Sequence, residues 1–241
     1  MRRITYLGHA TTLVELDGVR LLTDPVLRRR VLHLRRSGSA PPVGHPDAIL
    51  ISHGHQDHLD LPSLRRFSRE TPIVVPRGLG RAVHEFSDVR ELDEGDEVAV
   101  GAVTVRATHA DHGGRALPGR STAAVGYALL GSGRIFFAGD TGLFDGMEGL
   151  VPGLDVALLP IWGWGPTIGP GHLDPRGAAE ALTLLRPRLA VPIHWGTLRP
   201  VYRSARAEFL RAPANDFVAA ARELAPGIEV RVLAPGESLD F

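Results

Sequence analysis

The chain has 241 residues, 44% of them apolar and 22% charged, a composition typical of a globular protein that can bury a core without disulfides. Its 27 basic residues, all arginine, balance 27 acidic ones, so no net charge draws it to nucleic acid, and we expect no stable nucleic-acid partner. The absence of cysteine excludes disulfides, thiolate zinc sites and cysteine nucleophiles. No apolar run approaches the roughly 20 residues of a membrane span, and the N-terminus lacks the apolar core of a signal peptide, so we expect a cytoplasmic protein.

The first 46 residues predict antiparallel strands followed by a loop. Strands are expected at 3–8, 11–16 and 19–23, with Asp17-Gly18 as the hairpin turn between the last two. Residues 27–46 hold five arginines and three prolines without a clean period, which indicates an ordered surface loop or lid.

The rest of the chain alternates apolar strands with helices. Short apolar runs, typical of strands buried on both faces, occur at 48–52, 72–75, 156–160 and 189–193. Hairpin strands are expected at 97–107, 125–130 and 134–138, and a last strand at 229–233. Helices are expected at 61–70, 78–86, 175–185 and 214–224. This order predicts an α/β (α+β) protein, with two sheets and helices outside them, built as one domain over residues 1–241.

The most specific motif is His-Gly-His-Gln-Asp-His at 53–58, directly after a buried strand. A bend there can turn His53 and His55 toward one point and Asp57 and His58 toward a neighbouring one. Neutral imidazole and carboxylate are ligands that borderline divalent metals favour. The alternative is a solvated polar turn; an expression tag would be a terminal homopolymer, whereas this cluster is internal and mixed.

Partners for these residues occur at other strand ends. Asp140 follows strand 134–138, His194 follows strand 189–193, and His109 and His112 follow the hairpin strand 103–107. Each is weak evidence alone, because Asp and His are common at strand ends. Together they predict a metal centre at one edge of the sheets.

These motifs together resemble the metallo-β-lactamase superfamily. The resemblance rests on residues 53–58, Gly139-Asp140-Thr141 and the Pro-Ile-His-Trp-Gly-Thr segment at 192–197, and it extends over residues 4–200. Residues 5–25 are similar to the branch that includes N-acyl-phosphatidylethanolamine-hydrolysing phospholipase D and L-ascorbate-6-phosphate lactonase. The family fold is a four-layer αββα sandwich, in agreement with the expected elements.

The resemblance implies two divalent metal ions, zinc by default and manganese as the alternative. It assigns His53, His55 and a third histidine to the first ion, Asp57, His58 and His194 to the second, and Asp140 to both. The third histidine aligns better with His112 than with His109. The resemblance also puts Asp24 behind a ligand, and His9 near the site as a supporting, substrate-facing or structural residue. His109 then remains beside the site.

The family chemistry is hydrolysis by a water shared between two dications, whose pKa falls to about 7 in favourable zinc sites. Asp57 would orient this water or accept its proton. His172 would stabilise the leaving group, or alternatively contact the helix at 175–185. The expected substrate is a phosphate ester, a phosphodiester or a lactone. The alternative is a non-catalytic relative that binds a metal or another ligand, and the complete ligand set argues against it.

Two segments contain residues that we expect to bind a small, anionic substrate. Arg28, Arg29 and Arg30 open an arginine-rich stretch that suits phosphate, or anionic lipid headgroups in a peripheral lipid contact. The alternative is a solvated loop. Trp162 and Trp164 follow a buried strand and would form an apolar wall or cap the core.

Overall fold

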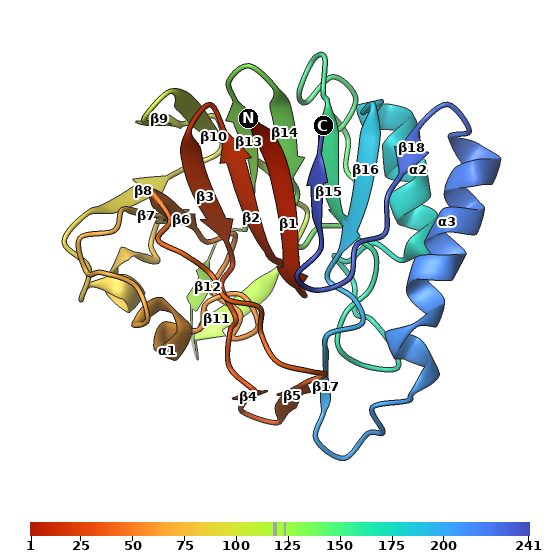
Figure 1. Ribbon diagram of the computed structural model, residues 1–241, viewed down its shortest axis with the longest axis horizontal. Coiled ribbons are helices and arrows are strands. Elements are labelled where there is room, and N and C mark those ends of the chain that lie inside the picture. The colour runs from red at the N-terminus through yellow and green to blue at the C-terminus, as the bar shows by residue number, and fades with distance from the viewer. Residues whose placement is uncertain (118–119, 123) are drawn as a thin grey trace.

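Two seven-stranded sheets lie face to face in the computed structural model, which describes residues 1–117, 120–122 and 124–241 (Figure 1). The first sheet has the order β19-β1-β2-β3-β6-β7-β8, with strands β1 (Arg2–Gly8), β2 (Thr11–Leu16), β3 (Val19–Thr23), β6 (Ala48–Leu50), β7 (Ile73–Pro76), β8 (Val89–Leu92) and β19 (Ser238–Asp240). The second has the order β18-β16-β15-β14-β13-β10-β9, with strands β9 (Glu97–Val100), β10 (Val103–His109), β13 (Val125–Leu130), β14 (Arg134–Phe137), β15 (Val156–Pro160), β16 (Leu189–Ile193) and β18 (Glu229–Val230).

The alternation of side chains along each strand builds three apolar layers. Val14, Leu21, Tyr127 and Phe137 are among the buried side chains between the sheets. Successive strand residues point to opposite faces, so their neighbours form a second layer outside each sheet. On the first sheet this outer layer packs under α1 (Leu61–Leu64) and the short 3-10 helix η1 (Gly80–Val83).

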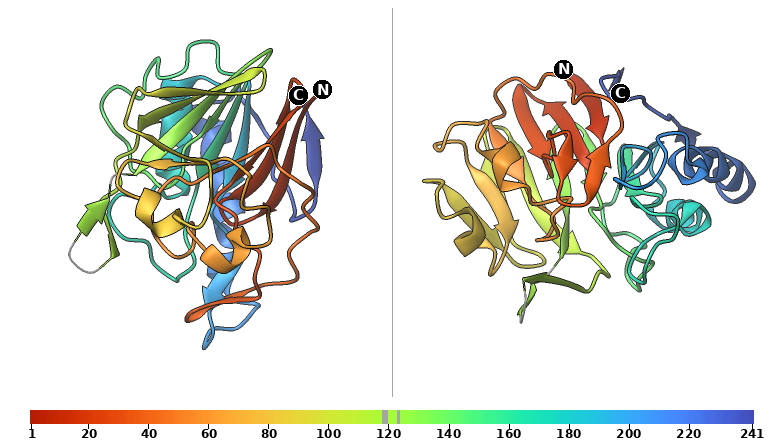
Figure 2. Two further views of the ribbon diagram at one scale, coloured as in Figure 1. Left: turned by 90° about the vertical axis from the view of Figure 1, so that its left-hand side faces the viewer. Right: turned by 90° about the horizontal axis from the view of Figure 1, so that it is seen from below.

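The outer face of the second sheet packs against two longer helices, α2 (Pro175–Leu185) and α3 (Ala212–Leu224). Both helices lie along one side of the molecule, as Figure 1 and the right view of Figure 2 show. The predicted four-layer αββα sandwich is therefore confirmed. No helix in the described part of the chain is both long and apolar enough to cross a bilayer.

Several elements differ in length from the sequence-based prediction. The helix predicted at 61–70 ends at Leu64, because the next amides bond three residues back and tighten the turn: Arg66 N donates to Ser63 O and Phe67 N to Leu64 O. The helix predicted at 78–86 is only the 3-10 turn η1, and the strand predicted at 229–233 is only β18. Strands β8 and β19 were not predicted.

The predicted loop at 27–46 contains a hairpin, β4 (Arg30–Val31) and β5 (Leu34–Arg36). β5 pairs with β17 (Leu198–Pro200), which follows β16 of the second sheet along the chain. This three-stranded sheet lies beyond the lower edge of the two large sheets in Figure 1. A further hairpin consists of β11 (Gly114–Leu117) and β12 (Arg120–Thr122).

Candidate metal centre

Side chains from loops of both large sheets meet at one edge of the sandwich. The turn between β1 and β2 supplies His9, and the segment after β6 supplies residues 53–58. The segments after β10, β14 and β16 supply His112, Asp140 and His194. The strands are joined by many hydrogen bonds, so a rigid frame sets where these loop residues lie.

The first group of potential metal ligands is His53, His55, His112 and Asp140. One ligand atom from each lies within 4.8 Å of those of the others. His55 Nδ1 lies 2.9 Å from His53 Nε2 and 3.2 Å from His112 Nε2. The group thus contains the predicted ligands of the first ion, with His112 as the third histidine.

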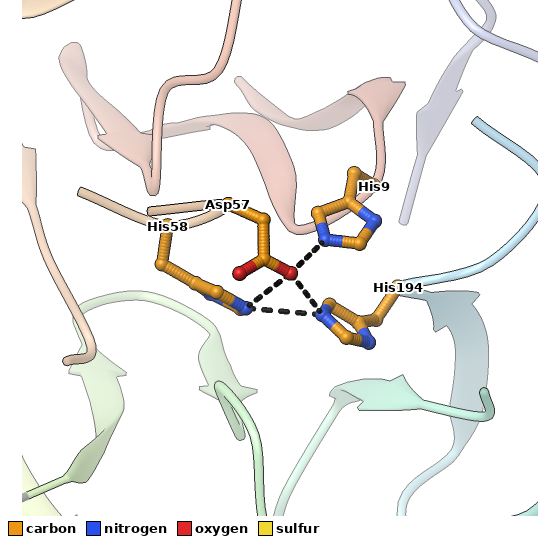
Figure 3. Close-up of side chains that lie close together, drawn as sticks. All are labelled: His9, Asp57, His58 and His194. Carbon is orange, nitrogen blue, oxygen red and sulfur yellow. Dashed lines mark hydrogen bonds and ion pairs between the residues drawn. The ribbon is translucent and has the colours of Figure 1, made fainter. Parts of the chain in front are cut away.

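The second group is His9, Asp57, His58 and His194, and all four are buried (Figure 3). His58 Nε2 lies 3.0 Å from His194 Nε2, and Asp57 Oδ2 lies 3.7 Å and 3.5 Å from these two nitrogens. His9 Nε2 lies 2.9 Å from Asp57 Oδ2. Three members are the predicted ligands of the second ion, and His9 joins them.

Asp140 lies between the two groups. Its Oδ2 is 3.2 Å from His58 Nε2 and 3.9 Å from His53 Nε2, and its Oδ1 is 3.2 Å from His194 Nε2. Oδ1 is buried and has no hydrogen-bond partner in the described part of the chain. A buried carboxylate oxygen without a donor is costly, and a cation at this point would remove that cost. The arrangement fits a carboxylate shared by two metal ions.

Outward hydrogen bonds fix how the imidazoles point. His58 Nδ1 lies 2.7 Å from the Asp24 carboxylate, and His194 Nδ1 donates to Trp162 O at 2.8 Å. His112 Nδ1 donates to Gly171 O, also at 2.8 Å. With a proton on Nδ1, a neutral imidazole directs the Nε2 lone pair inward, which is the tautomer that a metal needs.

Asp24 therefore lies behind His58, and it is itself held in place. Its carboxylate accepts hydrogen bonds from Ser52 N at 2.7 Å and from Ser52 Oγ at 2.6 Å. Ser52 Oγ is also 3.0 Å from His53 Nδ1, so one serine links supports of both groups. The sequence analysis did not single out Ser52; its place directly before the histidine motif was the available signal.

Burial and charge set the protonation of the two groups. Burial lowers the pKa of His53, His55 and His112, which favours the neutral imidazole that binds metal. Burial opposes ionisation of Asp140, but the charges of His194 and His58 hold its pKa well below the usual range. The first group therefore offers three neutral nitrogens and an anionic oxygen, a donor set suited to a divalent cation.

His58 behaves differently from these histidines. Burial lowers its pKa, but the charges of Asp140, Asp57 and Asp24 outweigh burial and raise the pKa well above the usual value. A proton on His58 thus partly neutralises the carboxylates that a cation would neutralise. Protons and metal ions should therefore compete for the second group.

A pocket of about 420 Å³ opens onto the two groups of potential ligands. Its lining includes His55, Asp57, Asp140, His172 and Trp164 from the centre and its surroundings. His172 Nε2 is 3.3 Å from Asp140 Oδ2. The hairpin of β4 and β5 supplies the rest of one wall, from Val31 to Leu34.

The remaining predicted site residues lie outside the two groups of potential ligands. His109 is exposed and its Nδ1 lies 2.9 Å from Glu94 Oε2, outside both groups. Arg28 pairs with Asp60, whose side chain caps α1, and Arg29 and Arg30 are exposed but do not line the pocket. Trp162 contributes its carbonyl oxygen to His194, while its indole Nε1 donates to Gly165 O.

Gly139 precedes Asp140 and has a φ of +63°. A Cβ at this position would lie 2.7 Å from Ser52 Cβ. We expect Gly139→Ala to lower the free energy of unfolding by roughly 2 kcal/mol or more, from left-handed strain and the clash, and to weaken metal binding. Urea unfolding in chelator and metal analysis measure the two effects.

Gly146→Ala is the matched control for this variant. Gly146 also has a positive φ, +90°, but a Cβ there would meet nothing within 4 Å. Equal losses of stability in both variants, with unchanged metal content, would mean that the contact with Ser52 is unimportant.

Known proteins resemble this chain along most of its length. A family model described as the Beta-lactamase superfamily domain matches residues 19–195. A UPF0173 metal-dependent hydrolase of Methanopyrus kandleri is 32% identical over 252 residues and is aligned over 99% of each chain. An N-acyl-phosphatidylethanolamine-hydrolyzing phospholipase D of Caenorhabditis elegans is 34% identical over 80% of this chain and 63% of the relative. The solved structure of Igni18, a metallo hydrolase from Ignicoccus hospitalis, has a TM-score of 0.76 at 25% identity, over 100% of this chain and 98% of its own.

Proposed function

The chain belongs to the metallo-β-lactamase superfamily and is a metal-dependent hydrolase, and on that basis we propose that it cleaves a phosphate ester, a phosphodiester or a lactone with two bound divalent ions. The observation that carries this proposal is the pair of ligand groups joined by Asp140 at the pocket. The similarity to a phospholipase D supports the phosphodiester within this set. A single domain over residues 1–241 would contain both ligand groups and the pocket.

The donor atoms suit zinc first and manganese second, since neutral imidazoles outnumber carboxylates. His53, His55 and His112 would hold one ion, Asp57, His58 and His194 the other, and Asp140 both. Two such cations, when bound, lower the pKa of water and polarise the bond to be cleaved.

Asp57 and His172 would take part in proton transfer. Burial opposes ionisation of Asp57, but the charge of His58, the neighbouring His194 and a hydrogen bond from His9 keep its pKa well below the usual range, so it is anionic and can orient a water or accept a proton. Burial lowers the pKa of His172, yet its hydrogen bond to Asp140 raises it overall. His172 lines the pocket and can therefore hold a proton for the leaving group.

The pocket wall favours a substrate with an anionic centre and an apolar arm. Leu32 is 58% exposed and lines the pocket, and the His33 ring meets the Trp164 ring edge-on at 5.1 Å. Arg29 and Arg30 are exposed on the same hairpin and pair with no carboxylate among the described residues. Their charge would raise the local concentration of anions at the rim.

Metal content tests the proposal most directly. We expect about two ions of zinc or manganese per chain by elemental analysis, and loss of hydrolysis of bis-p-nitrophenyl phosphate or a simple lactone after chelation. Restored activity on return of the metal is the control for irreversible damage. Less than about 0.3 ion per chain after both metals are offered would contradict the proposal. Two bound ions without turnover of either substrate would instead favour a non-catalytic relative.

The anionic substrate is tested by removing charge from the hairpin. For Arg29→Gln combined with Arg30→Gln, we expect kcat/KM for the anionic diester to fall about 3- to 10-fold at low salt, and less at high salt. A neutral lactone should be unaffected. Arg28 is left in place because its pair with Asp60 supports α1. Arg222→Gln, on the distant helix α3, is the control. Equal effects on both substrates would make the hairpin arginines ordinary surface residues.

A further inference from the structure

His9 is held at the metal centre by its backbone. It lies in the turn between β1 and β2 with a φ of +58°, and its side chain is fully buried. His9 N donates to Thr197 Oγ1 at 2.9 Å, and His9 O accepts from His194 N at 2.8 Å. The residue thus ties the first sheet to the loop that carries His194.

The His9 side chain contacts two members of the second group. Its Nε2 lies 2.9 Å from Asp57 Oδ2, and its ring centroid lies 4.0 Å from that of His194 (Figure 3). Asp57 and His194 come from opposite sheets, so the ring of His9 bridges the two halves of the sandwich at this point.

The second ring nitrogen indicates how His9 acts. His9 Nδ1 is buried and has no hydrogen-bond partner among the described residues. A proton on Nδ1 would be a buried donor without an acceptor, while Asp57 Oδ2 offers an acceptor to a proton on Nε2. The proton therefore belongs on Nε2, and a nitrogen that carries a proton does not bind a metal.

We propose that His9 is a positioning residue for the second metal ion: it donates an Nε2 hydrogen bond to Asp57 and holds His194 through its backbone and ring. Each ligand of that ion then has its own support, with Asp24 behind His58 and Trp162 O behind His194. The first group has supports of its own, so His9 should affect only the second ion. This inference rests on the proposed two-ion site.

His9→Ala and His9→Gln test the inference. Glutamine Nε2 is separated from Cβ by as many bonds as histidine Nε2, so it can restore the donor to Asp57, whereas alanine cannot. The metal-free proteins are titrated with Zn²⁺ by calorimetry and with Co²⁺ by absorption spectroscopy, in parallel with His109→Ala as an exposed control. We expect His9→Ala to bind the first ion as the unsubstituted protein does and the second ion about 10- to 100-fold more weakly. His9→Gln should recover most of that loss.

Three results would overturn the inference. Unchanged binding of both ions in His9→Ala would remove any positioning role, and equal weakening of both ions would make His9 a structural residue. Loss of the second ion in His9→Gln as complete as in His9→Ala would make His9 itself a ligand. If His9→Ala does not fold, His9→Gln alone still separates the positioning role from the ligand role. Failure of the unsubstituted protein to bind a second ion, or to hydrolyse any substrate, contradicts the proposed function instead and is measured separately.

Discussion

Replacing Asp140 with alanine should abolish hydrolysis while leaving the sandwich folded. Asp140 belongs to the first group and also approaches the second, within 3.2 Å of His58 and of His194, and His172 lies beside it. Under the proposed two-ion mechanism, its loss would remove the ligand that both ions share and that would set their spacing. Stabilisation of developing charge by such bound ions contributes several kcal/mol. We therefore expect activity to fall about 10³-fold, measured as kcat on the best diester or lactone substrate.

Asp145→Ala is the matched control, because Asp145 is an exposed aspartate in the same segment after β14. It should keep nearly full activity. The far-ultraviolet circular dichroism of Asp140→Ala should match that of the unsubstituted protein, since the apolar layers do not include Asp140. Retention of more than about a tenth of the activity would show that Asp140 is not shared between two ions.

His112→Ala should remove one metal ion, and His109→Ala should remove none. His112 Nε2 reaches the first group and its Nδ1 is fixed by Gly171 O, whereas His109 is exposed beside Glu94. A site left with His53, His55 and Asp140 loses one of four donors, so its affinity should fall by at least about 100-fold. Elemental analysis after dialysis against a weak chelator measures the expected change from two ions to about one.

Measuring both variants also identifies the ligand if the assignment of the third histidine to His112 is wrong. Loss of an ion in His109→Ala with full occupancy in His112→Ala would mean that the segment after β10 adopts another arrangement when metal is bound. His109→Ala should change the melting temperature little, since an exposed ion pair contributes at most about 1 kcal/mol.

The strand ends made the candidate centre predictable from the sequence. Apolar runs such as 48–50 and 189–193 are buried on both faces, so they could be recognised without knowing their partners. Polar residues that closely follow an apolar strand lie at the end of that strand, so the sequence predicts the place of Asp140 after 134–138 and of His194 after 189–193.

Other features depended on contacts between distant segments. β19 is short and polar on its exposed side, and it is a strand because β1 offers it a free edge. Leu32 lines the pocket only because β5 pairs with β17, some 160 residues later, and turns the hairpin toward the site. Local periodicity carries no information about such pairings.

Backbone strain could not be predicted from the sequence either. His9, Asp24 and His194 all have positive φ values, of 58°, 33° and 61°, although none is glycine. Such residues are uncommon, and their concentration at this centre fits the tendency of strained backbone to occur at functional sites. The sequence could suggest that His9 was near the site, but only the left-handed turn brings its ring against Asp57.

The pairing of β19 with β1 has a practical consequence for handling this protein. It brings the first and last described residues together, with Phe241 N donating to Arg2 O, and both termini lie at one end of the molecule (Figure 1). β1 runs from there to Gly8, and the turn with His9 follows its far end. Fusion partners or surface tethers attached at either terminus would therefore project away from the pocket. A linker of a few residues would close the chain into a circle, and a new opening in the exposed turn at Gly101 would yield a circular permutant with an unaltered metal centre.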